Sequence, residues 1–408
     1  MSIGIVTTGG AGLSSEGYGT QTSVKIFWIL FVTVFAVMLG HGIMLPVLPI
    51  FAKGLGATGL WIGVIFSGYS LSRVVLMPVI GRLSDIYNRK TIIVAGLALY
   101  TLFSLLYPAA SSPESLALIR FFHGFASAMV VPVAMAFAAD LAPRSQEGRY
   151  MGTFIISFLF GMGLGPVIGG MLFDRSGING VFFFMSALTA ISFVICLFLP
   201  PLSGSLRQPV PLMQIFKVRG MAYPLFFQLI ASFLTAVFIA FFPILARAVP
   251  QPVTVGQIGI IMSANLLMTT GLQYHFGKIA DRHDKRYLLA AGLIIIAAVL
   301  AVLPVLASFT AFLCAAIILG IGAGISIPAA IALMTVAGRS SGQGMAMGVF
   351  VTVIGIGMMI GPIIAGVVSD VFGIAAVFSF CALVSFLAVP VIFLLAKYPA
   401  STVSGESA

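Results

Sequence analysis

Two arginines and two histidines lie within apolar stretches of this chain, away from its charged segments. Arg120 and His123 are three residues apart, so on a helix they share one face. Arg73 and His41 lie in two other apolar stretches. A buried guanidinium can bind an anion, and it can keep a neighbouring imidazole neutral until a proton arrives. The sequence therefore predicts ligand binding at Arg73 and Arg120, and proton coupling in which His41 or His123 carries the proton and Arg120 is the fixed charge.

The ten acidic residues are absent from the middle of these stretches. Each lies in an expected tail, loop or helix end: Glu16, Asp85, Glu114, Asp140, Glu147, Asp174, Asp281, Asp284, Asp370 and Glu406. A proton-transfer site deep in the protein then needs a histidine, which titrates near about pH 6.5 when unperturbed. The alternative site is Asp140, at the end of the stretch that carries Arg120. Either histidine can also be a satisfied core residue.

Three of the uncharged polar residues inside apolar stretches are also candidate binding residues. They are Tyr69, Gln228 and Asn265. A phenol or an amide at such a position can bind a small molecule, so we predict that these residues complete a binding site with Arg73 and Arg120. The alternative is that the amides only bind neighbouring helices.

The elements that carry these residues must be solvated by lipid. Apolar residues make up 60% of the chain and charged residues 7%, with a mean hydropathy of +1.18; soluble proteins have about 25% charged residues. Such a chain cannot cover a soluble fold, so we predict an all-α integral membrane protein. The net charge of +10 is dispersed over short loops, which argues against a nucleic-acid partner. Three single cysteines in apolar runs predict neither a disulfide nor a metal site, and we expect no cofactor and no enzyme activity.

A spanning helix needs about 20 apolar residues, and the chain contains twelve such runs. They cover residues 26–51, 60–80, 91–109, 115–139, 150–173, 178–200, 221–246, 255–276, 287–307, 310–335, 343–368 and 372–396. We therefore expect an amino-terminal six-helix bundle at 25–200 and a carboxy-terminal one at 221–397. The remaining segments are expected to be cytoplasmic: tails at 1–24 and 398–408, and a linker at 201–220.

The basic residues predict the orientation. Of the 20 Lys and Arg residues, two lie within expected spans and three, Lys53, Arg175 and Arg247, lie in loops on one side, which leaves 15 for the other side. By the positive-inside rule the richer side is cytoplasmic. Both termini then lie in the cytoplasm of a multi-pass protein of the cell (inner) membrane. Arg120 falls in the outer half of its span, so extending to the outer interface is an alternative role for it.

A charged segment occurs twice, as GRLSDIYNRK at 81–90 and GKIADRHDKR at 277–286. Gly81, Asp85 and Arg89 each have a counterpart 196 residues later. The same offset relates further residues: Gly63 and Gly259, Tyr69 and Asn265, Gly124 and Gly320, Pro132 and Pro328, Gly165 and Gly361, Pro166 and Pro362, Gly170 and Gly366, Asp174 and Asp370. An even number of spans per copy gives two parallel six-helix repeats, with a cavity between the halves.

Small residues form one face of the expected fifth helix. Gly161, Gly165 and Gly169 recur every four residues, and Pro166 bends the helix. Small faces let helices approach closely in lipid. We predict that this helix is the surface on which the two halves move, with tight packing alone as the alternative.

These motifs resemble those of the major facilitator superfamily from about residue 25 to residue 397. GRLSDIYNRK resembles the family's segment between the second and third helices, with Asn88 where glycine is usual; Asn tolerates a left-handed backbone. The resemblance implies that this cluster closes the inner side in one state. The residues so assigned to conformational gating are Gly81, Asp85, Arg89 and Lys90, with Gly277 and Asp281 in the second copy.

Two further motifs refine the resemblance. Arg120 with Gly124 resembles a buried-arginine motif of proton-linked members, and GMGLGPVIGG at 161–170 resembles a signature of drug/proton antiporters. The resemblance implies a monomeric secondary transporter that exports a small organic molecule in exchange for protons. One alternative cargo is an anionic metabolite, chelator or organic acid, because the buried charge is positive. A non-transporting sensor, which would usually carry a soluble domain, or a lipid translocase is the alternative of another class.

Overall fold

The computed structural model describes residues 20–142, 146–201, 221–341 and 343–396, and these are helices joined by short connections, without a strand. The elements are α1 (Thr20–Gly54), α2 (Gly59–Ile86), α3 (Arg89–Leu106), η2 (Tyr107–Ala109), α4 (Pro113–Asp140), α5 (Glu147–Cys196), α6 (Ala222–Ala248), α7 (Val255–Arg282), α8 (Lys285–Val302), η4 (Leu303–Val305), α9 (Phe309–Ser341), α10 (Gln343–Phe372) and α11 (Ile374–Ala396). The predicted all-α membrane fold is confirmed. Helix α1 begins within the expected tail, whose residues 1–19 lie outside the described residues, as do 202–220 and 397–408.

Helix α5 contains two membrane crossings. Its 50 residues would span about 75 Å if straight, against a bilayer core of about 30 Å. Gly177 interrupts it with φ 65° and ψ −165°. Its counterpart at the offset of 196, Gly373, also has a positive φ, of 87°, and separates α10 from α11. Eleven helices of the described chain are long and apolar enough to cross a membrane, and the division of α5 gives the twelve crossings that the sequence predicts.

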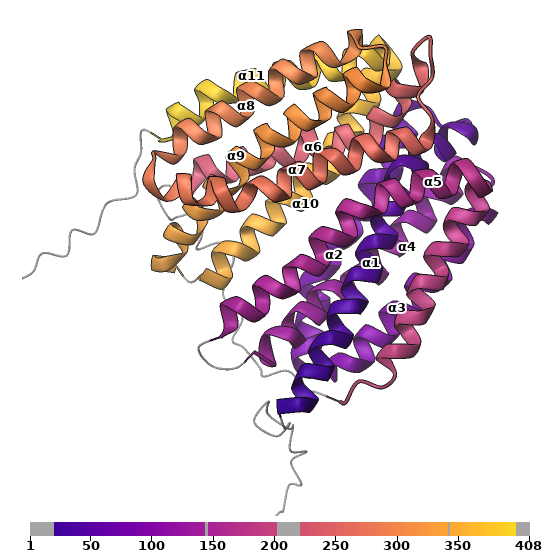
Figure 1. Cartoon of the computed structure of the whole chain (residues 1–408), viewed down its shortest axis with the longest axis vertical. Coiled ribbons are helices and arrows are strands. Elements are labelled where there is room, and N and C mark those ends of the chain that lie inside the picture. Colours follow the sequence, from indigo (N-terminus) through magenta and orange to yellow (C-terminus); the bar gives the residue numbers. More distant parts are fainter. Residues whose placement is uncertain (1–19, 143–145, 202–220, 342, 397–408) are drawn as a thin grey trace, which may run out of the picture.

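The helices form two bundles that meet at one end and diverge at the other. Figure 1 shows the amino-terminal bundle, from indigo to magenta, and the carboxy-terminal bundle, in orange and yellow, converging near α5 and separating towards the opposite end. The start of α1 and the end of α11 both lie at the diverging end, as an even number of crossings requires. Between the bundles, α2 packs against α10 and α5 packs against α7.

The sequence repeat reappears in the helix caps. Thr58 and Thr254 cap α2 and α7 with their side chains. Asn88 and Asp284 cap α3 and α8 by accepting from the amide of the second residue beyond. Asn88 has φ −63° and ψ 118°, which is extended backbone, so the expected left-handed conformation at this position is wrong. Asparagine is used here as a helix cap, where its side-chain oxygen satisfies a free amide.

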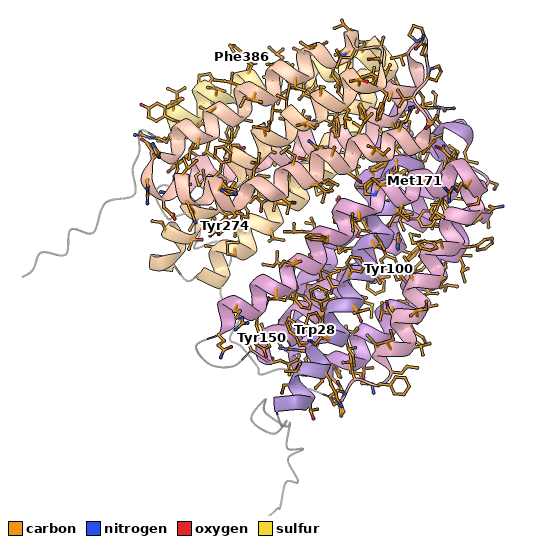
Figure 2. All side chains as sticks on the ribbon, viewed as in Figure 1. Trp28, Tyr100, Tyr150, Met171, Tyr274 and Phe386 are labelled. Carbon is orange, nitrogen blue, oxygen red and sulfur yellow. The ribbon has the colours of Figure 1, made fainter. Side chains whose placement is uncertain are left out.

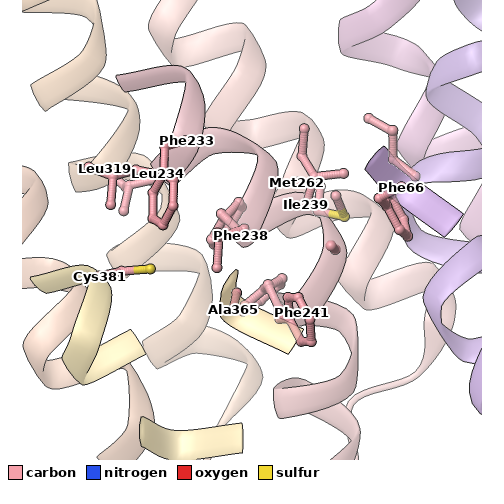
Figure 3. Packing of buried hydrophobic residues seen from close by; sticks show 14 of the residues in the cluster. Phe66, Phe233, Leu234, Phe238, Ile239, Phe241, Met262, Leu319, Ala365 and Cys381 are labelled. Atoms are coloured by element: carbon pink, nitrogen blue, oxygen red, sulfur yellow. The ribbon is translucent and has the colours of Figure 1, made fainter. Parts of the chain in front are cut away.

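Apolar side chains fill the bundles and cover their outer surface. The largest core cluster includes Phe238 (Figure 3). The Phe238 ring stacks on Phe242, with 4.7 Å between the ring centroids. Large apolar side chains also point outward, such as Phe386 on α11, which is 62% exposed (Figure 2). An exterior of this kind is solvated by lipid hydrocarbon.

Candidate functional site

A cavity of about 550 Å³ lies between the two bundles. The amino-terminal bundle provides most of its wall through α1, α2, α4 and α5, and α6 and α10 provide the rest. Its polar side chains all come from the amino-terminal bundle: His41, Tyr69, Ser70, Arg73 and Arg120. The other lining residues are apolar, with five methionines among them. A volume of this size accommodates a small organic molecule.

Tyr69 lies at the centre of the charged part of the cavity. Its ring centroid is 4.3 Å from the guanidinium carbon of Arg120 and 5.6 Å from that of Arg73. The centroid of the His41 ring lies 4.8 Å from that of the Tyr69 ring. The phenol oxygen donates to Ser127 Oγ at 2.8 Å, which fixes the ring. The structure therefore brings together four of the residues that the sequence singled out on three different helices.

Both guanidinium groups lack an acidic partner in the part of the chain that the structure describes. Arg120 is 2% exposed, and its Nη1 contacts Met44 Sδ at 2.9 Å. The Nε atoms of Arg73 and Arg120 and the Nδ1 atom of His41 are buried without a hydrogen bond. Among the residues that the structure describes, Arg73 and Arg120 form no salt bridge, since those found involve Arg89 and Arg286. Buried charges are usually paired, so this cavity has room for an anion.

His123 lies behind the cavity rather than on its wall. The side chain is fully buried, and its ring lies 4.0 Å from the Tyr100 ring, centroid to centroid. Its Nδ1 is 2.9 Å from the hydroxyl of Tyr107. Its ring is 6.0 Å from that of Tyr69. His123 is therefore a second layer behind Tyr69, whereas His41 contacts the cavity directly.

The predicted binding residues of the carboxy-terminal bundle do not line this cavity. Asn265 lines a separate pocket of about 160 Å³ and donates through Nδ2 to Ala316 O at 3.0 Å. Gln228 is buried on α6, and its Oε1 lacks a hydrogen bond. The structure thus places Tyr69, Arg73 and Arg120 together, and places Asn265 and Gln228 elsewhere in the opposite bundle.

Two aspartates connect the bundles at the converging end, which we call the closed end (residues 54–59, 174–177, 248–255 and 370–374). Asp370 of α10 accepts from the amides of Gly59 and Leu60, at 2.6 and 2.8 Å. Asp174 of α5 accepts from the amide of Gly256 at 2.8 Å. Each carboxylate thereby caps the first turn of a helix in the other bundle, where free amides and the helix dipole favour a negative charge.

Glycines allow the close contact beneath these caps. A Cβ at Gly59 would lie 2.6 Å from Gly366 O, and Cβ atoms at Gly63 and Gly259 would collide with the carbonyls of Pro362 and Pro166. Ser67 donates to Met359 O, and its repeat counterpart Ser263 accepts from Val167 N at 3.2 Å. The contact is therefore built twice, once by each copy of the repeat.

The face formed by Gly161, Gly165 and Gly169 lies within one bundle. Cβ atoms added to them would meet the backbone of α1, and the one at Gly165 would be 2.5 Å from Gly42 Cα. The glycine stripe, which we expected at the surface between the halves, therefore packs α5 against α1 instead. A neighbouring face of the same helix, at Pro166 and Gly170, contacts the other bundle.

The charged segments lie at the diverging end, which we call the open end (residues 81–90 and 277–286). They are mostly helical, since α2 continues to Ile86 and α7 to Arg282. Cβ atoms at Gly81 and Gly277 would meet nothing within 4 Å among the described residues, and Gly152 and Gly348 are equally open. Helices α2, α5, α7 and α10, which connect the bundles at the closed end, are thus separated at the open end.

Arg89 connects Asp85 of its own segment with Asp140 at the end of α4. It is 4% exposed, forms a short ion pair with Asp140, and lies 3.8 Å from Asp85. Asp140 ends α4, where its charge opposes the helix dipole, so the arginine offsets an unfavourable position. Lys90 is half-buried and Asp281 is exposed. In the second copy, hydrogen bonds from Arg286 hold the pKa of Asp284 below its usual value.

The two interbundle caps are the functional candidates that the sequence reasoning missed. Asp174 and Asp370 are visible in the sequence as a repeat pair. Their role could not be read from the sequence, because each carboxylate accepts hydrogen bonds from backbone amides in the other bundle. Every residue except proline has such an amide, so the residue types do not identify the partner.

Comparisons with known proteins agree with this architecture. The family model described as Major Facilitator Superfamily matches residues 30–249 and 224–408. The chain is 31% identical over 371 residues to the uncharacterized MFS-type transporter MJ1560 of Methanocaldococcus jannaschii, covering 88% of this chain and 95% of that one. It is 27% identical over 355 residues to the quinolone resistance protein NorA of Staphylococcus aureus, covering 85% and 90%.

Solved structures share the fold at low identity. A bacterial homologue of the human lysosomal transporter Spinster, in an inward-facing and occupied conformation, superposes with a TM-score of 0.82 at 14% identity, covering 93% of this chain and 98% of that one. The nucleoside transporter NupG superposes with a TM-score of 0.78 at 16% identity, covering 91% and 99%. The chain belongs to the Major Facilitator Superfamily and is a multi-pass membrane transporter, not an enzyme.

Proposed function

We propose that the protein exports a small organic molecule by alternating access, in exchange for protons. The observation that carries this proposal is the cavity between the bundles, which diverge towards the open end and are held together at the closed end by paired contacts. The likeness to NorA, named for quinolone resistance, supports export as the direction. A monomer is sufficient, because the cavity is formed within one chain.

The charge distribution gives the orientation of this state. The open end carries the two charged segments and, by the count of basic residues, faces the cytoplasm. The structure then represents an inward-facing state that can load cargo from inside the cell. The opposite state would separate the caps at Asp174 and Asp370 and bring the segments at 81–90 and 277–286 together.

An anionic cargo is the version of this function that the cavity favours. Arg73 and Arg120 are the charged side chains of its described wall, and both lack an acidic partner. A carboxylate could accept hydrogen bonds from both guanidinium groups and from His41. A cationic drug would instead add a third positive charge in a poorly screened environment. An organic acid or a similar anion therefore fits this wall better than a cation.

The coupling proton has one candidate on the cavity wall. His41 contacts Tyr69, and Tyr69 lies over Arg120, so a proton on His41 would repel the guanidinium and change what the site can bind. His123 is shielded by Tyr100 and Tyr107, and Asp140 is paired with Arg89. We therefore assign the proton to His41 in preference to His123, with Asp140 as the competing site.

Proteoliposomes loaded with a pH-sensitive dye test the function. Sets of anionic, neutral and cationic compounds of similar size are supplied as outward gradients, and the internal pH is followed. We expect anionic compounds to produce pH changes that Arg73→Gln abolishes and that Lys25→Gln, at an exposed position near the start of α1, leaves intact. Movement of cationic compounds alone, unaffected by Arg73→Gln, would overturn the anionic assignment. No proton movement with any transported compound would overturn the exchange.

A further inference from the structure

The second pocket, of about 160 Å³, adjoins the main cavity. Ile239 of α6 lines both spaces. In the view of Figure 3, Ile239 lies between Phe66, a wall residue of the main cavity, and Phe238 and Leu234, which line the second pocket. The remaining lining residues come from α6, α7, α8 and α9, all in the carboxy-terminal bundle.

This pocket is apolar in effect, although four polar residues line it. The hydroxyl of Thr269 donates to Asn265 O at 2.8 Å, that of Thr235 to Ala231 O at 2.8 Å, and that of Ser326 to Gly322 O at 2.9 Å. The amide of Asn265 donates to Ala316 O. Each of the three hydroxyls and one N–H of the Asn265 amide thus donate to the backbone, and no charged residue is part of the lining. Hydrophobic surface is what the pocket offers to a ligand.

Equivalent positions of the sequence repeat line the main cavity and the second pocket, but with residues of different charge. Asn265 and Thr269 are the counterparts, at the offset of 196, of Tyr69 and Arg73. The same two positions therefore face a ligand space in each bundle, cationic in the amino-terminal bundle and uncharged in the carboxy-terminal one. A molecule that spans both spaces would place an anionic group at one end and an apolar group at the other.

We propose that the second pocket is a subsite for the apolar, ring-sized end of an amphipathic anion whose charged end binds Arg73 and Arg120. This inference rests on the proposed function and adds the chemical class of the cargo. An apolar cavity of about 150 Å³ is large enough to bind benzene, so a pocket of 160 Å³ holds one aromatic ring or a short branched chain. Ile239, which lines both spaces, lies at the junction of the two ends.

Binding to the purified full-length protein tests the subsite. The probes are phenylacetate, 4-phenylbutyrate and 6-phenylhexanoate, each compared by titration calorimetry with the carboxylate that lacks the ring, and 4-phenylbutylamine serves as the cation of matched shape. We expect one member of the phenyl series to bind on the order of tenfold or more tightly than its ring-free partner, because the ring is buried. The best chain length then reports the distance between the two ends.

Variants locate the ring. Ala323→Leu fills the pocket from α9 and Ala231→Leu fills it from α6, so either one should remove the advantage of the ring and leave the ring-free carboxylate unchanged. Cys314→Leu, on the exposed side of α9, is the matched control and should change neither. Thr269→Val keeps the shape and should preserve ring binding. Two filling variants on different helices keep the test valid if one of them does not fold.

The outcomes separate the subsite from the proposed function. An equal affinity for ring-bearing and ring-free carboxylates, with both lost in Arg73→Gln, overturns the subsite and leaves the anion site standing. A ring advantage that persists in both filling variants also overturns it. Preferential binding of 4-phenylbutylamine overturns the anionic cargo itself.

Discussion

Asp370 Oδ1 accepts a hydrogen bond of 2.6 Å from the amide of Gly59, which is 311 residues away in the chain and in the other bundle. Asp174 makes the equivalent contact with Gly256. Both carboxylates lie at the first turn of a helix, so their charge as well as their hydrogen bonds stabilises the contact. The sealed end of the cavity thus depends on two negative charges placed by the sequence repeat.

Replacing both aspartates by asparagine should open the closed end. Each substitution removes a charge from a helix terminus and weakens the contact by about 1–2 kcal/mol, which changes the population of the sealed state by roughly 5–30-fold per site. The measurement is labelling of a cysteine introduced at Ile258, which is buried at this end, with a membrane-impermeant maleimide added outside. Arg175→Gln leaves the caps intact and should not increase labelling.

The glycine stripe of α5 should tolerate no side chain at Gly165. A leucine there would collide with the backbone of α1 at Gly42, and overpacking of this kind costs about 1–3 kcal/mol. Because the contact lies within one bundle, we expect a lower melting temperature of the detergent-solubilised protein as well as reduced transport. Gly152→Leu, on the same helix with open space around it, is the control. Equal melting temperatures for both variants would show that the stripe is not tightly packed.

Arg89 should matter more than Asp85 for stability. Arg89→Gln leaves Asp140 unpaired at the end of α4, a loss of about 2 kcal/mol. Asp85→Asn removes an ion pair in which the two groups are 3.8 Å apart and the Asp85 side chain is a third exposed. Such a pair contributes less than about 1 kcal/mol to the free energy of unfolding. Thermal melting of the two variants checks the order, with Arg82→Gln as an exposed control. A larger loss for Asp85→Asn would mean that Asp85 makes the dominant contact.

Proton coupling should be lost in His41→Gln and retained in His123→Gln. Glutamine keeps a polar side chain at either position and removes titration, so binding should survive in both variants. The measurement is acidification of the interior of dye-loaded proteoliposomes during efflux. Coupling that survives in His41→Gln and is lost in Asp140→Asn would move the assignment to Asp140.

The sequence could predict the features that depend on composition and repetition. Twelve crossings followed from apolar length, and the offset of 196 related Asp174 to Asp370 and Gly63 to Gly259, which the structure places in paired contacts between the bundles. The grouping of Tyr69, Arg73 and Arg120 followed from their depth in expected spans. Such features are local or periodic, so a single sequence carries them.

Features that depend on which face meets which neighbour were not predictable. The stripe at Gly165 could be identified as a packing face, but its partner, α1 or the opposite bundle, is a property of the assembled helices. His123 and His41 have similar depth, and only packing distinguishes the buried one from the one on the cavity wall. The backbone amides that Asp174 and Asp370 bind leave no trace in side-chain chemistry.

Paired distance measurements by electron spin resonance in lipid nanodiscs test alternating access around this cavity most directly. One label pair spans the open end, at Tyr87 and Tyr287, and the other spans the closed end, at Lys53 and Phe372, in a Cys314→Ser background that removes the exposed native thiol. In the variant with both Asp174→Asn and Asp370→Asn we predict a new population in which the closed-end distance lengthens and the open-end distance shortens together. Lengthening at the closed end with an unchanged open end would contradict alternating access, because the bundles would then separate rather than rock.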